Sequence, residues 1–484
     1  MEDLDALLAA YPDGVAVPAA DVAAGTAGTV FVVLDDDPTG TQSVADLPVL
    51  TSWEKSDFDW ALGTGSPALY VLTNSRSLSG ADAAQINREV VQGALAAAAG
   101  RGIRLSFVSR GDSTLRGHFP LETDVLGEAL TAAGHRAPDA VILVPAFPDA
   151  NRVTLGSVHY MRSGTDLQPV AETEFARDAT FGYASSNLRS YVEEKTGGRV
   201  PAADVVALTL EIIRRGPAAV AAELANLTGA RPVVADAVTE DDLRLLALGL
   251  QQAEAAGQRF LYRVGPPFVR AAIGQEQHAP LTADDAYGQN PETREREGGL
   301  IVVGSHVGLT TRQLNHLQAV RPPAFTAEID VALILDDAER EAHLAAVVDA
   351  VSAALDTGDV VLHTSRLLVT AETGDDSLDI SRRVSAAVVD VVRRVLAANP
   401  PRFVIAKGGI TSSDVASKGL EIRRALVRGP MLPGIVSLWE PVDGPAQGIP
   451  YIVFAGNVGD DSSLAAVVST LSKAPGSVRS ASFS

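Results

Sequence analysis

Hydrophobic and polar positions follow a repeating order along most of the chain. A short run of apolar, often β-branched residues is followed by a loop of Gly, Ser, Thr and Asp, and then by an Ala-rich stretch with helical spacing. In the first half this order predicts strands at 30–34, 68–72, 103–108, 140–144 and 205–208, and helices at 81–99 and 121–133. Apolar strands that alternate with amphipathic helices are typical of a parallel sheet covered by helices on both faces.

The same order returns in the second half, after a polar segment without periodicity at 282–298. Strands are predicted at 300–303, 360–363, 403–406, 434–439 and 451–454, and a helix at 310–320. A chain of 484 residues exceeds what one hydrophobic core usually supports. We therefore predict an α/β protein of two domains, each a mainly parallel sheet flanked by helices, with a ligand cleft between them. The predicted parts are an N-terminal extension at 1–28, a first domain at 29–285, a linker at 286–298 and a second domain at 299–484.

Composition narrows the class of protein. Hydrophobic residues make up 46% of the chain and charged residues 20%, as in soluble globular proteins. No apolar run approaches the roughly 18 residues of a membrane helix. The acidic start, Met1-Glu2-Asp3, has no features of a secretory signal, so a cytoplasmic protein is expected. The absence of cysteine excludes disulfides and thiolate chemistry, and the net charge of -21 argues against nucleic-acid and membrane partners.

The first predicted strand runs into an acidic loop, Asp35-Asp36-Asp37-Pro38-Thr39-Gly40-Thr41. Successive carboxylates repel one another and have little strand propensity, so a packed core gains nothing from them. Placed after a buried strand, they suit a metal ion, a polyhydroxylated ligand or a proton transfer. An acidic turn capped by an Asp side chain is the alternative interpretation. If the strand runs to its end, Asp35 points away from Asp36 and should tolerate substitution better.

Other loops of the first half are also rich in functional groups. The loops at 73–76, 109–118 and 145–152 each follow a predicted strand. In open parallel sheets, ligands bind outside the carboxyl ends of the strands. Arg supplies forked donors for a carboxylate or phosphate, whereas Asp, Ser and Thr pair with hydroxyls. Together the loops predict a site for a small hydroxylated carboxylic acid, although any single Arg could equally form a surface ion pair.

The second half has glycine-rich loops instead. Gly304-Ser305, Gly408-Gly409-Ile410-Thr411 and Gly456-Asn457 each follow a predicted strand and precede a helix. Glycine permits close backbone approach, and a helix N-terminus favours anions. These junctions therefore favour a phosphate-bearing nucleotide. Neither the P-loop pattern nor the dinucleotide fingerprint occurs in the chain.

The ordered set of motifs resembles the four-carbon acid sugar kinase family. The resemblance rests on Asp36-Asp37-Pro38-Thr39-Gly40, Ser75-Arg76, the intact Asp-Ser-Thr-Leu-Arg-Gly at 112–117, the segment 145–152 and the three glycine junctions. It implies an ATP-dependent kinase that phosphorylates the terminal hydroxyl of threonate, erythronate or a 3-oxo-tetronate. It also implies that the first domain holds the sugar acid and the second holds the nucleotide.

The resemblance and the loop chemistry together assign candidate roles. The catalytic candidates are Asp36, Asp37 and Asp112, and the sequence does not choose the general base among them. The substrate-binding candidates are Asp36, Thr39, Arg76, Arg110, Asp112, Ser113 and Arg116. The nucleotide-binding candidates are Gly304, Ser305, Gly408, Gly409, Ile410, Thr411, Gly456 and Asn457. Mg²⁺ is expected with ATP; its protein ligands are left open, with Asp460 as one candidate, and a homodimer is also left open.

Two other classes of function remain as alternatives. Asp35-x-Asp37-x-Thr39 also fits the DxDxT signature of haloacid-dehalogenase-like phosphotransferases, with Asp35 as the nucleophile and Gly459-Asp460-Asp461 as the late acidic motif. A non-catalytic sensor of sugar acids is the third interpretation. The dependence of any activity on a nucleotide separates these alternatives from the kinase.

Overall fold

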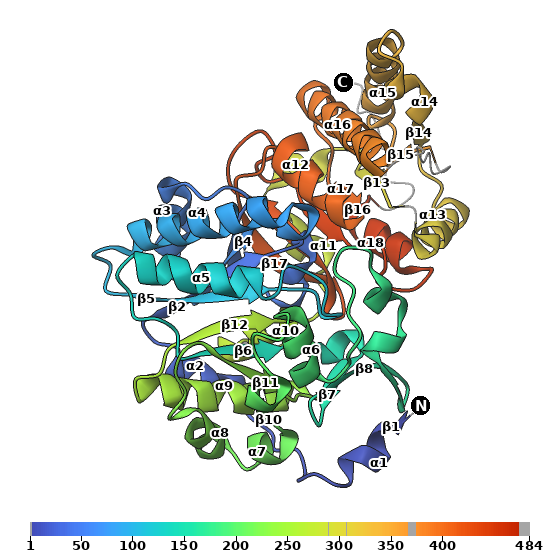
Figure 1. Cartoon of the computed structure of the whole chain (residues 1–484). Helices are drawn as coiled ribbons and strands as arrows, with labels where there is room; N and C mark the ends of the chain where they lie inside the picture. The colour runs from blue at the N-terminus through green and yellow to red at the C-terminus, as the bar shows by residue number, and fades with distance from the viewer. Residues whose placement is uncertain (1, 289, 306, 366–373, 474–484) are drawn as a thin grey trace. The chain divides into compact units, whose positions relative to one another are not determined.

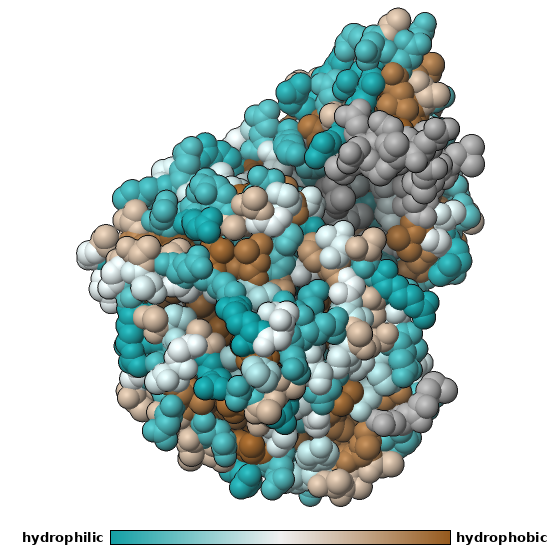
Figure 2. All heavy atoms as spheres, viewed as in Figure 1, coloured by the Kyte–Doolittle hydropathy of each residue, from teal (hydrophilic) through white to brown (hydrophobic). Residues whose placement is uncertain are grey.

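The computed structural model describes residues 2–288, 290–305, 307–365 and 374–473. The chain divides into two compact units, residues 1–278 and 279–484, each built from strands and helices (Figure 1). The predicted α/β class is confirmed in both units. In the described part of the chain, none of the helices combines the length and the apolar character needed to cross a membrane. Figure 2 shows hydrophilic residues over much of the visible surface, between smaller hydrophobic areas.

The main sheet of the first unit is entirely parallel. Its strand order is β10-β11-β6-β12-β5-β2-β4-β3. The strands are β2 (Thr29–Asp35), β3 (Leu47–Leu50), β4 (Ala68–Leu72), β5 (Arg104–Arg110), β6 (Ala140–Val144), β10 (Val206–Leu208), β11 (Arg231–Ala235) and β12 (Phe260–Val264). The strands predicted at 68–72 and 140–144 are confirmed to the residue, whereas β3, β11 and β12 were not predicted.

Helices cover both faces of this sheet. Figure 1 shows α3 (Lys55–Gly63), α4 (Gly80–Ala98) and α5 (Leu121–Ala132) on one face, and α2 (Ala19–Gly25), α8 (Pro217–Leu224), α9 (Glu240–Ala255) and α10 (Pro266–Ala272) on the other. Val32 and Leu34 of β2 share a buried core with Val90 and Val91 of α4. This burial on both faces explains why the strands have near-continuous apolar sequences.

The first unit also has a small antiparallel sheet, formed by three strands that follow β6 in the chain and by one at the N-terminus. Its order is β1-β9-β8-β7, with β1 (Glu2–Asp3), β7 (Arg152–Leu155), β8 (Val158–Ser163) and β9 (Asp166–Pro169). These strands are short and carry many polar residues, so they lack the apolar runs by which the other strands were predicted. The sheet is important for the site because β7 and β8 contribute buried side chains to it.

The second unit has a mixed sheet with the order β17-β18-β19-β16-β13-β15-β14. The parallel strands are β13 (Leu300–Val303), β14 (Phe325–Ile329), β15 (Val360–Thr364), β16 (Val404–Lys407) and β19 (Tyr451–Phe454). The hairpin of β17 (Arg424–Leu432) and β18 (Ile435–Pro441) adds antiparallel strands beside β19. Its helices are α11 (Ala283–Tyr287), α12 (Pro291–Glu295), α13 (Gly308–Val320), α14 (Val331–Leu335), α15 (Arg340–Ala354), α16 (Gly374–Ala398), α17 (Gly409–Asp414) and α18 (Ser463–Leu471).

The polar segment at 282–298 is not the irregular stretch that its sequence suggested. It contains α11 and α12, and Tyr287 is buried in the core of the second unit. The Tyr287 hydroxyl donates to the Leu471 carbonyl at 2.5 Å, and the Arg402 guanidinium stacks on its ring at 4.6 Å. The Thr282 side chain and Asp285 form a capping box that begins α11, a signal that a search for apolar periodicity does not detect.

Candidate functional site

The functional loops of the first unit lie at one edge of its sheet. Strands β5, β2 and β4 are neighbours, and Asp35 pairs with Arg110 in the register of β2 and β5. Backbone hydrogen bonds join the loops that follow: the Arg76 N–H donates to the Asp36 carbonyl at 3.3 Å, and the Asp36 N–H donates to the Arg110 carbonyl at 3.3 Å. The parallel topology thus brings the acidic loop together with the loops that begin at Thr73 and Gly111.

Arg76 and Arg110 connect the carboxylates of the acidic loop. Arg76 Nη2 lies 3.1 Å from Asp36 Oδ1 and 3.2 Å from Asp37 Oδ2. Arg110 contacts the Asp35 carboxylate through Nε and Nη2, and its Nη2 lies 3.3 Å from Asp36 Oδ1. Asp35 therefore belongs to the same cluster as Asp36, and the expectation that it points away from Asp36 is wrong. The reason is that β2 ends at Asp35, so strand alternation does not continue to Asp36.

The Asp112–Arg116 loop closes the other side of this cluster. Arg116 Nε lies 2.6 Å from Asp112 Oδ2, and the Thr114 N–H donates to Asp112 Oδ1 at 3.1 Å. Arg76 Nη1 is 3.6 Å from Asp112 Oδ2, which links the two loops. The Arg116 guanidinium also lies over the Phe175 ring, 5.1 Å from its centroid. Thr39 donates its backbone N–H to Asp37 Oδ1 at 2.8 Å, so it also lies at this edge of the sheet.

Successive carbonyls of the Asp112–Arg116 loop are fixed by buried side chains from later in the chain. His159 Nε2 donates to the Ser113 carbonyl at 2.7 Å, the Tyr183 hydroxyl donates to Thr114 at 2.7 Å, and the Tyr191 hydroxyl donates to Leu115 at 2.8 Å. His159 is itself oriented by Thr154 Oγ1, 2.9 Å from Nδ1, and burial lowers the pKa of His159 to about 4. The small antiparallel sheet and the segment after it thus fix the conformation of the loop.

Arg263 and Glu122 belong to the cluster but were not predicted. Arg263 Nη1 lies 2.7 Å from Glu122 Oε2, and its Nη2 lies 4.0 Å from Asp36 Oδ2. Arg263 lies within the apolar strand Phe-Leu-Tyr-Arg-Val at 260–264. Because charged residues are rarely buried without a partner, a cation in such a strand indicates a functional residue and could have identified Arg263 from the sequence. Its path requires Gly111, because a Cβ there would lie 2.2 Å from Arg263 Cζ.

The carboxylates of the site differ in their protonation. Burial raises the pKa of Asp36, although Arg76, Arg110 and Arg263 oppose the shift. Burial also acts on Asp37 and Asp112, but there the neighbouring arginines prevail and lower the pKa of each carboxyl. Burial raises the pKa of Asp35 to about 8, against the attraction of Arg110. Among the three predicted catalytic residues, Asp36, Asp37 and Asp112, Asp36 is thus the one whose pKa is raised, as a general base requires.

Some buried polar atoms of the cluster have no hydrogen-bond partner. Among the described residues these include Asp36 Oδ2, an acceptor, and Arg76 Nε, a donor. Leaving such atoms unpaired away from water is costly, so their presence at a sheet edge points to a ligand that supplies the missing partners. A hydroxyl would satisfy the carboxylate oxygen, and an anionic oxygen would satisfy the guanidinium.

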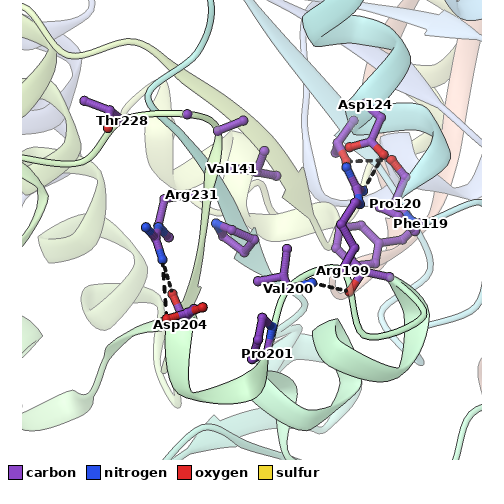
Figure 3. Close-up of a pocket in the computed structure, with 15 residues that line it drawn as sticks. Phe119, Pro120, Asp124, Val141, Arg199, Val200, Pro201, Asp204, Thr228 and Arg231 are labelled. Carbon is purple, nitrogen blue, oxygen red and sulfur yellow. Dashed lines mark hydrogen bonds and ion pairs between the residues drawn. The ribbon is translucent and has the colours of Figure 1, made fainter.

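A separate pocket lies at the opposite ends of β6 and β11 and contains none of the predicted site residues. It has a volume of about 350 Å³ and is lined by Phe119, Val141, Val200 and Pro232 among others. Figure 3 shows Arg199 beside Asp124 and Arg231 beside Asp204, at ion-pair distances of 2.6 and 3.8 Å. Both of these arginines are therefore paired with carboxylates.

The glycine junctions of the second unit also converge. Strands β19, β16 and β13 are neighbours, and the N–H groups of Gly304 and Ser305 both donate to the Lys407 carbonyl, at 3.2 and 3.3 Å. The loops pack closely on one another: a Cβ at Gly304 would lie 2.0 Å from Thr411 Oγ1, and one at Gly456 would lie 2.5 Å from Ser305 Oγ. Gly409 and Ile410 begin α17, and Asn457 is exposed.

Lys407 is a buried amine at the centre of these junctions. It ends β16, directly before Gly408, and Nζ donates to the Ala455 carbonyl at 2.9 Å. Nζ also lies 3.8 Å from the centroid of the Phe454 ring. Burial lowers the pKa of Lys407 to about 7. Sequence reasoning missed this residue because a single Lys at a strand end is an ordinary surface feature.

Metal candidates are sparse in the described part of the chain, which has no group of three or more His, Asp and Glu side chains that could hold a metal ion. Asp460 Oδ1 accepts hydrogen bonds from Ser462 N, Ser462 Oγ and Ser463 Oγ at 2.9, 2.7 and 2.9 Å. Asp460 therefore caps the turn before α18. Its suggested role as a metal ligand has no support from this geometry.

Comparisons with known proteins agree with the division into two units. One family model, described as a sugar-binding N-terminal domain, matches residues 31–272, and another, a nucleotide-binding C-terminal domain, matches residues 300–464. A D-threonate kinase of Bordetella bronchiseptica is 27% identical over 448 residues, which cover 90% of this chain and 95% of that protein. A D-threonate kinase of Salmonella typhimurium is 26% identical over 368 residues, covering 73% and 77%.

Solved structures share the fold. A Salmonella typhimurium protein superposes with a TM-score of 0.65 at 18% identity, covering 90% of this chain and 98% of that one. A Haemophilus influenzae protein superposes with a TM-score of 0.59, also at 18% identity, covering 91% and 100%. At this level of identity the likeness concerns the fold alone.

Proposed function

The chain belongs to the four-carbon acid sugar kinase family, and on that premise we propose that it transfers a phosphoryl group from ATP to the terminal hydroxyl of a four-carbon sugar acid. The observation that carries this proposal is the buried Asp36 carboxylate, with one oxygen that has no hydrogen-bond partner, among arginines at the carboxyl edge of the first sheet. That edge lies within the segment matched by the sugar-binding model. The threonate, erythronate and 3-oxo-tetronate class fits the mixture of donors and acceptors there.

Asp36 is the proposed general base. Asp36 Oδ2 has no hydrogen-bond partner, with Arg263 Nη2 4.0 Å away, and would accept a proton from a substrate hydroxyl, whereas Oδ1 is contacted by Arg76 and Arg110. Asp112 is a poorer base because Arg116 and Arg76 pair with it and its pKa is lowered. Asp37 is likewise held by Arg76 and by the Thr39 N–H. Phosphoryl transfer depends mainly on positioning and charge neutralisation, which these arginines would provide.

The nucleotide is proposed to bind at the glycine junctions of the second unit. Gly304, Gly408 and Gly456 let the three loops approach closely, and the buried amine of Lys407 lies at their centre, where a bound phosphate would favour its protonated form. ATP would supply the phosphoryl group, with Mg²⁺ on its phosphates. Mg²⁺ commonly keeps several waters and takes one or two carboxylates in such sites, so a dedicated group of acidic residues is not required.

The phosphatase-like alternative is disfavoured by the surroundings of Asp35. Arg110 contacts Asp35 Oδ1 through two nitrogen atoms, and Gly40 packs against both carboxylate oxygens, since a Cβ there would lie 2.2 Å from Oδ1 and 2.4 Å from Oδ2. A nucleophile that forms an aspartyl-phosphate needs an open carboxylate oxygen. Asp35 is instead placed to orient Arg110.

A coupled ADP-release assay with a matched panel of substrates tests this proposal. The panel contains D- and L-threonate, erythronate, 3-oxo-tetronates and the neutral alditols of the same length. We expect ADP release with at least one of the acids and far slower release with the alditols. Equal rates with acids and alditols would show that the arginines do not recognise a carboxylate, and hydrolysis of phosphoesters without ATP would support the phosphatase-like alternative.

A further inference from the structure

The arginines of the first-unit cluster differ in whether a carboxylate already neutralises them. Arg76, Arg110, Arg116 and Arg263 each have at least one carboxylate partner within the cluster. Arg152, the first residue of β7, forms no ion pair with any carboxylate of the described residues. Its guanidinium donates from Nη1 to the Ala150 carbonyl at 3.3 Å, and its Nε is buried without a hydrogen-bond partner.

Arg152 nevertheless belongs electrostatically to the cluster. The positive charges of Arg76, Arg116 and Arg152 all lower the pKa of Asp112. Burial lowers the pKa of Arg152, while Asp112 acts in the opposite direction. His159 is close enough for Arg152 to lower its pKa, and a histidine carries no negative charge that would balance the arginine. A half-buried cation without a carboxylate partner is costly unless a ligand completes it.

The backbone holds Arg152 in place before any ligand binds. The Arg152 N–H donates to the Phe147 carbonyl at 2.9 Å, and the Phe147 N–H donates to the Arg152 carbonyl at 2.8 Å. Between them, Asn151 adopts a left-handed conformation with φ of 61°. This closed turn follows β6, so Arg152 is presented from the same carboxyl edge of the sheet as the other loops.

We propose that Arg152 binds the carboxylate of the sugar acid and thereby distinguishes the acid from the neutral sugar. The inference rests on the proposed function. The paired arginines, Arg76 and Arg110, then serve to hold the acidic loop and to neutralise the transferred group. Arg152 supplies the unpaired forked donor that a carboxylate accepts.

Two variants of Arg152 test this assignment in the full-length chain. Arg152→Gln removes the charge and the fork, and Arg152→Lys keeps the charge alone. The direct readout is isothermal titration with D-threonate and with the neutral alditol, in the absence of nucleotide. Arg152→Gln should weaken threonate binding by roughly tenfold to a hundredfold, the usual loss for a charged hydrogen bond, and Arg152→Lys should lose less.

Kinetics and stability separate this role from a structural one. Arg152→Gln should raise KM for the acid and leave kcat nearly unchanged, because the carboxylate is bound equally in the ground and transition states. Its melting temperature without ligand should equal or exceed that of the wild type, since an unpaired buried charge is removed. The shift of the melting temperature on adding threonate should be lost.

Arg199→Gln is the matched control. Arg199 pairs with the partly buried Asp124 at the opposite edge of the sheet (Figure 3), so Arg199→Gln removes the same charge without touching the cluster. It should bind threonate like the wild type. Wild-type affinity in both Arg152→Gln and Arg152→Lys would overturn the inference while leaving the proposed function intact. A wild type that neither binds nor phosphorylates any sugar acid would overturn both.

Discussion

Adjacent aspartates of the acidic loop have different surroundings, so their variants should behave differently. Asp36→Asn removes the proposed base while keeping the size of the side chain. We expect kcat to fall by about a hundredfold or more, the usual contribution of acid–base catalysis, with ATP affinity unchanged. Asp37→Asn is the matched control, because an amide oxygen can still accept the Thr39 N–H at the start of the 3-10 turn, and its kcat should fall less. Equal losses in the two variants would contradict the assignment.

The pH dependence of the wild type should agree with this assignment. A general base must be deprotonated, so kcat/KM should fall as the pH drops through the pKa of Asp36. Burial raises that pKa, and the fall should therefore begin at a higher pH than for an ordinary Asp. A profile that stays flat down to the normal range of an Asp carboxyl would contradict the role of Asp36.

Lys407 should make stability depend on pH. Burial lowers its pKa to about 7 in the folded protein, from 10.5 ordinarily. Between these values the unfolded chain binds more protons than the folded one, so the contribution of Lys407 to stability rises with pH. Lys407→Met should remove this rise. Melting temperatures of both proteins from pH 7 to 10 check this. The melting temperature of the wild type should rise relative to that of the variant as the pH increases. A difference between the two that stays constant over this range would contradict the lowered pKa.

The sequence identified much of the acidic and basic cluster at residue level. Asp36, Arg76, Arg110, Asp112 and Arg116 lie together because their loops follow neighbouring parallel strands. Their catalytic and binding roles stay predictions. Glu122 and Arg263 were missed because one is an acidic residue in the first turn of a helix and the other lies in a strand. Arg152 ends the loop 145–152 that the sequence analysis selected, but it was not among the assigned substrate-binding candidates. Only the spatial contacts reveal that they join the cluster.

At the scale of elements, the close approach of Arg263 to the backbone of the loop after β5 gives a stability prediction. A Cβ at Gly111 would lie 2.2 Å from Arg263 Cζ, so Gly111→Ala must displace the guanidinium from Glu122. We expect a loss of about 1–3 kcal/mol in the free energy of unfolding, typical of overpacking. Gly127→Ala, inside α5 with its nearest atom at 3.5 Å, should instead be neutral or stabilising. Urea denaturation of both variants measures the contrast, and equal changes would contradict it.

Element prediction succeeded where apolar runs were continuous and failed where other signals specify the structure. Strands β4, β6, β13 and β19 match their predicted bounds because each is buried on both faces. The small sheet of β7–β9 is formed by short polar strands, and α11 begins at a capping box. Neither has the hydrophobic period on which the prediction relied.

At the scale of the whole molecule, the α/β class could be predicted from the alternation of strands and helices. The antiparallel hairpin of β17 and β18 could not be predicted, because the apolar pattern of a strand does not reveal whether it runs parallel or antiparallel to its neighbour. The net charge of -21 also conceals the concentration of arginines at one sheet edge. An acidic protein needs such a local concentration of arginines to bind an anionic substrate.

The central claim is that the phosphoryl group moves from ATP to the terminal hydroxyl of a four-carbon sugar acid. Phosphorus NMR of a reaction containing the full-length chain, Mg²⁺, ATP and D-threonate, with the other acids of the panel in parallel, tests it most directly. We predict that ADP and a phosphomonoester on the terminal oxygen appear in equal amounts, and that Asp36→Asn suppresses both. ADP and inorganic phosphate without a sugar phosphate, from every acid in the panel, would contradict the account.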